Sequence, residues 1–591
     1  MKKKIFKKRR IKIFEFRSFS TRAYIIFGCF IILIAISSAK AFSLQITNYT
    51  VWKEKALAQQ AQGIDLTPKR GEIFFQDKNG NLVPAAINNT KYNIAIDPSK
   101  VKEEEKEEIA EILSLKLEIS KESVLAKISK TNDPYELLKQ NVEGELSKEL
   151  KQKIPSLILE EKDFRHYPNY LANQTIGFCS FDNLTNKCIG KYGLEAYYDH
   201  LLSGNDPTET NLAQIIQKGV WGAINDLYVT NGADLILTID PVIQQEVEKD
   251  LKLEVEKWSA KSGNVIVMDP KTGRILALAN YPDFNNNEYN KEKDISVFLN
   301  SAVSSRYEPG SVFKPFTLAA GLESGKITKN SSYFDKGEIT LNNKTIRNAG
   351  GSTPNKMISM ELFLQRSYNL GAVFIQQTIG NEYFKDFILN NLDFDEKTNI
   401  DLPAEINSSF SNLSRKEAQD IDFATASFGQ GIAVTPIKLI QEFAAFANGG
   451  DLVKPYIVDY IEINGQQTYT EPIVIKKVLK TETLQQEIPL LESVVSGEKG
   501  SGFLAKIEGY RIAGKTGTGE IPLENERGYS NRVNHTFVGF GPISDPKVII
   551  LTRLEDPKGV NYAEATAVPL FRKIMKFIID YYAISPDGLM N

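Results

Sequence analysis

The most informative stretch of the chain is Tyr307-Glu308-Pro309-Gly310-Ser311-Val312-Phe313-Lys314-Pro315-Phe316. Pro309-Gly310 interrupts the preceding element, and the apolar residues that follow recur at helical spacing, so a helix is predicted to begin near Ser311. Pro315 fits an early helical position, where its missing N–H is not needed. Ser311 and Lys314 are three residues apart and therefore share a helical face. A hydroxyl beside an amine suits a nucleophile and its base, if burial and nearby cations depress the pKa of the lysine.

The Ser-x-x-Lys spacing alone proves little, because it also begins at Ser37, Ser99, Ser496 and Ser544, where it indicates chance or solvated surface. Two further motifs follow Ser311 along the chain. Ser367-Tyr368-Asn369 lies in a predicted loop between helices, and Lys515-Thr516-Gly517-Thr518 ends a predicted strand. A second Lys-Thr-Gly, at Lys271, precedes the serine and occupies a predicted hairpin turn, so it is set aside.

Length and charge limit the function classes. A chain of 591 residues is too long for one compact core and predicts about two to four domains. A net charge of -3 and a pI near 6.0 argue against nucleic acid as a partner, because there is no overall basic excess to neutralise phosphates.

The N-terminus predicts a membrane anchor. Residues 1–22 contain ten Lys and Arg residues and one acid, and residues 23–39 are uncharged. With the apolar residues that continue to 44, this stretch approaches the length of a bilayer-spanning helix. Because positive residues stay inside, we expect a cytoplasmic tail (1–22), a single transmembrane helix (23–44) and an extracytoplasmic remainder. The alternative is a signal peptide cleaved near Ala39-Lys40-Ala41.

Three cysteines are present. Cys29 lies in the predicted span, whereas Cys179 and Cys188 flank a short polar loop on the predicted exported side, where oxidation is permitted. A Cys179–Cys188 disulfide is therefore a tentative prediction. Zinc is disfavoured because paired ligand spacings are missing and the chain has only three histidines.

The exported part reads as two domains. The first, 45–230, is expected to be α/β, with a strand from Ile73, a hairpin turn at Asp77 and exposed helices over residues 103–119 and 136–151. Asn231-Gly232 marks a boundary. The second domain, 231–591, is expected to contain a strand, a helix and a hairpin before Ser311, and a meander of three strands after residue 509.

Together, Ser311-x-x-Lys314, Ser367-x-Asn369 and Lys515-Thr516-Gly517-Thr518 form the ordered motif set of penicillin-binding proteins and related β-lactamases. The chain resembles a class B penicillin-binding protein, a membrane-anchored D,D-transpeptidase of peptidoglycan synthesis. That resemblance implies an α+β fold, in which helices flank an antiparallel transpeptidase sheet, with an N-terminal α/β pedestal. It is carried also by other stretches, namely Arg70-Gly71-Glu72-Ile73, Gly190 to Tyr198, Tyr307 to Gly310, Gly429-Gln430-Gly431 and Thr435-Pro436.

The resemblance also implies roles for the motif residues. Ser311 would attack a D-Ala-D-Ala stem peptide, with Lys314 as proton acceptor, while Ser367 relays a proton and Asn369 holds the donor peptide. Lys515 would add positive potential, and Thr516, Gly517 and Thr518 would bind the substrate, the two hydroxyls receiving its carboxylate. The N–H groups of Ser311 and Thr518 would form the oxyanion hole. No metal or organic cofactor is implied.

Several points stay open. A D,D-carboxypeptidase or β-lactamase-type hydrolase would use the same motifs, and a non-catalytic scaffold or β-lactam sensor would keep the fold for binding. The expected partners are peptidoglycan stem peptides, β-lactams, the membrane, a separate membrane glycosyltransferase and cell-division or elongation proteins. The stretches Phe537-Val538-Gly539-Phe540 and Ala567-Val568-Pro569-Leu570-Phe571 resemble the division type more than the elongation type.

Overall fold

The computed structural model describes residues 26–28, 30–31, 33–34, 68–130, 133–182, 187–204, 231–523, 526 and 528–588. The chain divides into two units, one made of residues 69–203 and 232–591 and the other of residues 1–68 and 204–231. The other unit, including the predicted span at 23–44, lies almost entirely outside the described residues. Within the described ranges, no helix is both long enough and apolar enough to span a bilayer.

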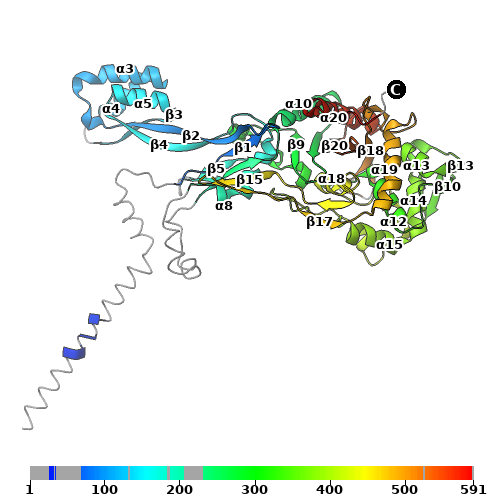
Figure 1. Ribbon diagram of the computed structural model, residues 1–591. Coiled ribbons are helices and arrows are strands. Elements are labelled where there is room, and N and C mark those ends of the chain that lie inside the picture. The colour runs from blue at the N-terminus through cyan, green and yellow to red at the C-terminus, as the bar shows by residue number, and fades with distance from the viewer. Residues whose placement is uncertain are drawn as a thin grey trace, which may run out of the picture. The chain divides into compact units, whose positions relative to one another are not determined.

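The second half of this unit is built on a five-stranded sheet whose neighbouring strands are all antiparallel (Figure 1). In sheet order the strands are β18 (Ala513–Pro522), β19 (Tyr529–Gly541), β20 (Val548–Glu555), β8 (Ser262–Met268) and β9 (Ile275–Tyr281). β18, which carries the Lys-Thr-Gly-Thr motif, is an edge strand of this sheet.

Helices cover both faces of the five-stranded sheet. Along β8, Val265 and Val267 belong to one hydrophobic core, whereas Ile266 and Met268 belong to another, as the two-residue period of a strand requires. The first core is closed by α10 (Pro241–Lys257) and α20 (Ala567–Tyr582). The second is closed by α12 (Lys314–Glu323), α18 (Pro436–Ala444) and α14 (Asn369–Ile379). The expected antiparallel sheet flanked by helices is confirmed.

The N-terminal part forms a mixed seven-stranded sheet. Its strands in order are β16 (Gln466–Tyr469), β15 (Val458–Ile463), β7 (Asp234–Leu237), β1 (Ile73–Gln76), β2 (Leu82–Ile96) and β3 (Glu136–Glu143), with β4 (Leu157–His166) also paired to β2. β1 and β7 pair in parallel. One sheet therefore unites strands from both sides of residue 230.

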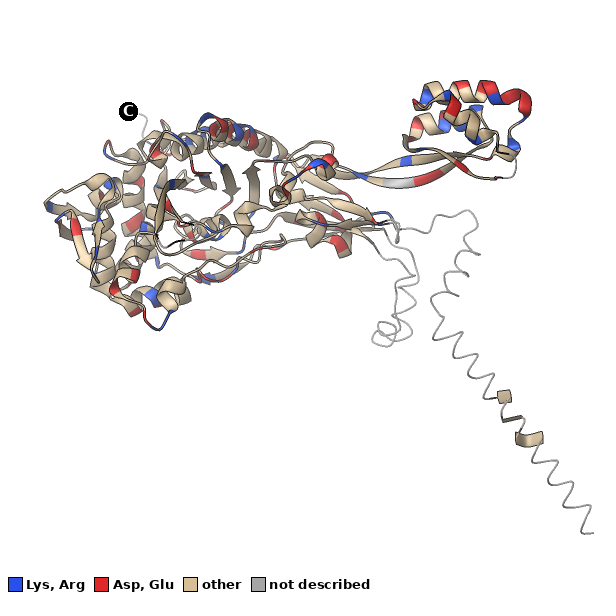
Figure 2. Ribbon diagram, turned by 180° about the vertical axis from the view of Figure 1, so that it is seen from behind, with Lys and Arg blue, Asp and Glu red and all other residues tan. Residues whose placement is uncertain are grey.

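One expected helix of the N-terminal part is wrong in its first half. Residues 136–143 form β3, which pairs with the long strand β2, and α5 (Gly144–Lys153) begins only afterwards. The charged helices α3 (Lys106–Leu117), α4 (Lys121–Ile128) and α5 close a separate hydrophobic core against β2 and β4. Their outer positions carry charges of both signs (Figure 2).

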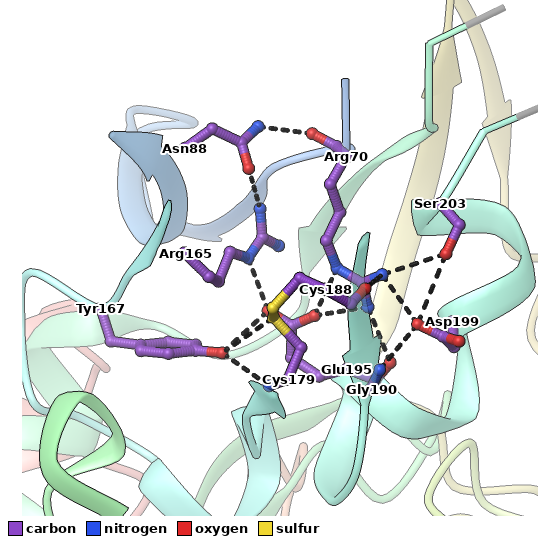
Figure 3. Close-up of a disulfide and its surroundings, with 10 residues drawn as sticks. All are labelled: Arg70, Asn88, Arg165, Tyr167, Cys179, Cys188, Gly190, Glu195, Asp199 and Ser203. Carbon is purple, nitrogen blue, oxygen red and sulfur yellow. Dashed lines mark hydrogen bonds and ion pairs between the residues drawn. A yellow bond between two sulfur atoms is a disulfide. The ribbon is translucent and has the colours of Figure 1, made fainter. Parts of the chain in front are cut away.

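A buried ion cluster lies at the start of β1 (Figure 3). Glu195, which is fully buried, pairs with Arg70 at 2.7 Å and Arg165 at 2.6 Å. Burial raises the pKa of the Glu195 carboxyl, but the two guanidinium groups outweigh burial and hold the pKa below its ordinary value. Beside the cluster, Cys179 and Cys188 are joined by a disulfide across the hairpin of β5 (Cys179–Asp182) and β6 (Lys187–Gly190).

Candidate active site

The serine stands on a tight turn that leads into a buried helix. Ser311 lies in a 3-10 turn, Gly310–Phe313, and α12 begins at Lys314, with Pro315 in its first turn. Gly310 has φ +58°, and a Cβ there would lie 2.5 Å from the carbonyl oxygen of Thr518. This close approach is open only to glycine, so Gly310 sets the serine turn directly against β18.

Lys314 is fully buried and points at the Ser-x-Asn triplet. Its Nζ donates to the main-chain oxygen of Ser367, to the Ser367 hydroxyl at 3.2 Å and to Oδ1 of Asn369 at 2.9 Å. Ser367 is the left-handed residue, at φ 55°, between α13 (Met360–Arg366) and α14. The predicted break between two helices is confirmed for Ser367, whereas Asn369 is the first residue of α14, and both side chains reach the lysine.

Lys515 reaches the same hydroxyl from β18. It is fully buried, and its Nζ donates to Ser367 Oγ at 2.9 Å and to the carbonyl oxygen and Oγ1 of Thr516 at 3.1 and 3.2 Å. Thr516 Oγ1 in turn shares a 2.8 Å hydrogen bond with the hydroxyl of Ser501. The side chains of Lys314, Ser367, Asn369, Lys515 and Thr516 thus form one connected polar network.

Burial and mutual repulsion favour neutral amines in this network. Burial, followed by the charge of Lys515, holds the pKa of Lys314 well below its ordinary value. Burial also lowers the pKa of Lys515 to about 7, against the opposing effect of Glu564. A depressed pKa favours the neutral form of Lys314, and a neutral amine can accept a proton whereas a charged one cannot.

The edge strand passes very close to the serine turn. A Cβ on Gly517 would lie 2.6 Å from the carbonyl oxygen of Pro309, and one on Gly519 would lie 2.0 Å from that of Glu308. The glycines on either side of Thr518 therefore let β18 cross the turn at contact distance. Both predicted oxyanion-hole residues, Ser311 and Thr518, lie at this crossing.

Several residues that contact the site are not among the predicted site residues. Arg347 and Asn348 hold the Ser-x-Asn triplet from behind, and Ser501 contacts Thr516. Glu308 accepts hydrogen bonds from Tyr529 at 3.3 and 3.1 Å, and burial raises the pKa of its carboxyl to about 7. Glu308 lies just before the serine, whereas Arg347, Asn348, Ser501 and Tyr529 are far from it in the sequence, so only the fold brings these four to the site.

The second copy of the Lys-Thr-Gly motif lies outside the site. The Lys-Thr-Gly at Lys271 lies between β8 and β9, where Lys271 pairs with Asp545, away from the serine turn. In the described part of the chain, no three His, Cys, Asp or Glu side chains are grouped so as to hold a metal ion.

Comparison with known proteins places this geometry in a family. Residues 263–576 match the penicillin binding protein transpeptidase domain, and residues 65–235 match the penicillin-binding protein dimerisation domain. Stage V sporulation protein D of Bacillus subtilis (strain 168) is 31% identical over 543 residues, which cover 89% of this chain and 80% of that protein. A peptidoglycan D,D-transpeptidase FtsI homolog of Mesostigma viride is 30% identical over 579 residues, covering 93% and 94%.

Solved structures agree at the level of the fold. The crystal structure of penicillin binding protein 2X from Streptococcus thermophilus has a TM-score of 0.76 and 21% sequence identity, and the match covers 88% of this chain and 80% of that one. With a transpeptidase domain that follows a dimerisation domain, and with relatives similar over nearly the whole length, the chain belongs to the class B penicillin-binding proteins, the family of monofunctional transpeptidases.

Proposed function

We propose that this chain is a peptidoglycan D,D-transpeptidase that cross-links stem peptides through an acyl-enzyme on Ser311. The observation that carries the proposal is the environment of Lys314. This lysine is fully buried, three residues after the serine, and a second buried lysine depresses its pKa further. Such an amine serves as a base, not as a surface charge.

In the first step, the Ser311 oxygen attacks the carbonyl carbon between the two terminal D-alanines, and its proton passes to Lys314. The N–H groups of Ser311 and Thr518 stabilise the oxyanion. The carbon–nitrogen bond then breaks as Ser367 relays a proton to the leaving amine, which departs as D-alanine. The Thr516 and Thr518 hydroxyls and Lys515 hold the terminal carboxylate, while Gly517 lets the substrate approach the strand and Asn369 holds the donor amide.

In the second step, the amine of a neighbouring stem peptide attacks the acyl-enzyme carbonyl. A carbon–nitrogen bond forms, the bond to Ser311 Oγ breaks, and the proton lost by the amine returns to Ser311. The new amide is the cross-link. β-Lactams would acylate the same serine, because their strained amide presents the same carbonyl to it.

Labelling with a fluorescent penicillin tests the proposal. We expect one covalent adduct, mapped by peptide mass spectrometry to Ser311, and none in Ser311→Ala. A folded wild-type protein that is not labelled would favour the non-catalytic scaffold. An adduct that hydrolyses within seconds would favour the carboxypeptidase or β-lactamase alternative.

We also infer that residues 23–44 anchor the chain in the cell membrane, with residues 1–22 in the cytoplasm and the transpeptidase domain outside. The support is the basic tail before an uncharged stretch. A protease added to intact spheroplasts should remove the bulk of the chain and spare the tail. A mature soluble protein beginning near Phe42 would show a cleaved signal peptide instead.

Glycan polymerisation would belong to a separate membrane glycosyltransferase, because residues 65–235 match a dimerisation domain. A division role is our preferred assignment. It is supported by the stretches Phe537-Val538-Gly539-Phe540 and Ala567 to Phe571. Depletion should give filaments under a division role and rounded cells under an elongation role.

A further inference from the structure

A buried amide lies directly behind the Ser-x-Asn triplet. Asn348, only 2% exposed, follows β12 (Lys344–Arg347). Its Nδ2 donates to both carboxylate oxygens of Asp335, at 3.0 and 3.1 Å, and to the carbonyl oxygen of Ser352 at 3.3 Å. Its Oδ1 accepts from the main-chain N–H of Leu370 at 3.1 Å. Asn348 therefore uses both its donor and its acceptor groups in the protein interior.

Asp335 fixes which way this amide faces. It is fully buried at the end of β10 (Ser332–Asp335) and also accepts from the Tyr333 hydroxyl at 2.9 Å and from the N–H of Gly337 at 2.8 Å. A carboxylate can only accept, so Asn348 must turn its NH₂ group toward Asp335. Its carbonyl oxygen then faces α14. There it satisfies the N–H of Leu370, one of the first-turn amides that a helix leaves unpaired.

The neighbouring residue fixes the catalytic asparagine in the same way. The main-chain oxygen of Arg347 accepts from Asn369 Nδ2 at 2.8 Å. A carbonyl also can only accept, so Asn369 presents its Oδ1, not its NH₂ group, to Lys314, where the distance is 2.9 Å. Residues 347 and 348 thus hold Asn369 and Leu370 by two parallel bonds.

We propose that Asn348, oriented by Asp335, is a positioning residue that fixes the Ser-x-Asn triplet so that Asn369 accepts a hydrogen bond from Lys314. This inference rests on the proposed function, because it assigns a role relative to the acylation of Ser311. Asn348 does not contact Lys314. It acts by anchoring the first turn of α14 to the buried carboxylate of β10, and with it the loop that carries Ser367.

Loss of Asn348 should change the pKa of Lys314, which a general loss of folding stability would not do. An oxygen directed at the amine of Lys314 favours its protonated form, whereas a displaced or rotated Asn369 withdraws that support. Loss of Asn348 should therefore lower the pKa of Lys314 while it also misplaces Ser367. The other charged groups around Lys314 are Lys515 on β18 and, beyond it, Glu564 and Arg366, and these stay unchanged.

The test is the rate of acylation by fluorescent penicillin across pH, in the full chain with the concentration of active sites titrated. Asn348→Ala should acylate about a hundredfold more slowly, the usual cost of about 1 Å of misplacement in an active site. The acidic limb of its pH profile should move to lower pH. Asn330→Ala, an exposed asparagine just before β10, is the matched control and should behave as wild type.

Exchange of the amide and the carboxylate tests the pairing of Asp335 with Asn348. Asn348→Asp alone places two carboxylates face to face and should acylate as poorly as Asn348→Ala. Asp335→Asn combined with Asn348→Asp restores one amide facing one carboxylate and keeps an acceptor for Leu370, so it should regain at least about tenfold over Asn348→Asp.

The inference is wrong if Asn348→Ala acylates within about threefold of wild type. It is also wrong if Asn348→Ala acylates more slowly only in proportion to a smaller fraction of active protein, with a pH profile like that of wild type. A wild-type protein that forms no adduct on Ser311 would instead refute the proposed function, so the two failures are distinguishable.

Discussion

Lys515 donates to the hydroxyl of Ser367 at 2.9 Å, although 148 residues separate the two in the chain. The same hydroxyl also accepts from Lys314 at 3.2 Å. Ser367 therefore lies between two buried amines that repel each other when both are charged. A hydroxyl that contacts both lysines is suited to carry a proton from the base to the leaving group.

Lys314→Ala should nearly abolish penicillin acylation without unfolding the protein. Removal of a general base typically costs about a hundredfold to ten-thousandfold in rate. The measurement is the second-order acylation rate, with thermal unfolding monitored in parallel. Unchanged acylation in a cooperatively folded Lys314→Ala protein would contradict the role of base.

Lys515 should affect both the acidic and the alkaline limb of the pH profile of acylation. Its charge lowers the pKa of Lys314, so Lys515→Gln should raise that pKa and move the acidic limb of acylation to higher pH. Because the pKa of Lys515 is about 7, its own charge is lost as the pH rises through that value. Lys515→Arg keeps its charge and should lack that alkaline limb, while retaining more activity than Lys515→Gln. Parallel profiles for all three proteins would rule out this coupling.

Removal of Glu195 from the buried ion cluster should strongly lower the stability of the protein. Glu195→Ala leaves Arg70 and Arg165 buried without their shared carboxylate, which typically costs about 3–5 kcal/mol. Urea denaturation measures the loss. Glu160→Ala, on β4, is an appropriate control, and an equal small effect in both variants would show that the cluster is dispensable.

Glu487 should make stability depend on pH. It is fully buried in α19 (Thr481–Ser496), and within the described residues neither carboxylate oxygen has a hydrogen-bond partner. Burial, then repulsion by Glu323, raises its pKa well above the ordinary value. The fold thus favours the neutral acid, and a stability penalty develops as the pH rises above the unfolded pKa, near 4.5.

At pH 8, Glu487→Met should therefore have a free energy of unfolding about 1–3 kcal/mol higher than wild type and should unfold at a higher temperature. This difference in stability should shrink toward pH 4.5. The exposed Glu482→Gln on the same helix should show no such trend. A gain for Glu487→Met that is the same at both pH values would indicate better packing alone.

Cys179 and Cys188 should resist alkylation until a reductant is added. Intact-mass analysis of protein from the oxidising compartment should show at most one alkyl group, on Cys29, without reductant and three after reduction in denaturant. Incorporation at Cys179 and Cys188 without reductant would show that the pair is open in the cell.

The parts of the fold that the sequence predicted are those with local signals. Ser367 and Asn369 were expected in a loop between helices. The structure has Ser367 there, whereas Asn369 is already the first residue of α14, because the break between the two helices spans only residues 367 and 368. The strand of the Lys-Thr-Gly-Thr motif was recognisable, but its position was wrong: β18 begins at Ala513, so the motif lies near the start of the strand and does not end it. The serine helix begins at Lys314, not Ser311, since Pro309-Gly310 is followed by a 3-10 turn.

The rest depends on partners that no local pattern names. Residues 136–143 have the composition of an exposed helix, yet they become a strand because β2 offers them a long edge. Asn348 resembles any turn asparagine in Asn-Ala-Gly-Gly, and its importance arises only because Asp335 and Leu370 lie on either side of it. The ionisable groups of the site likewise differ from surface lysines only through burial.

The parallel pairing of β1 with β7 also affects how the protein is made. The two strands lie about 160 residues apart in the chain, as the Glu72–Asp234 contact illustrates, and β15 is added later still. Until the intervening chain has been synthesised, β1 therefore has one edge unpaired, and such edges recruit other strands. A fragment ending at residue 230 would keep that edge permanently open. The sheet of the N-terminal part is therefore complete only when β7 and β15 of the catalytic half have joined it.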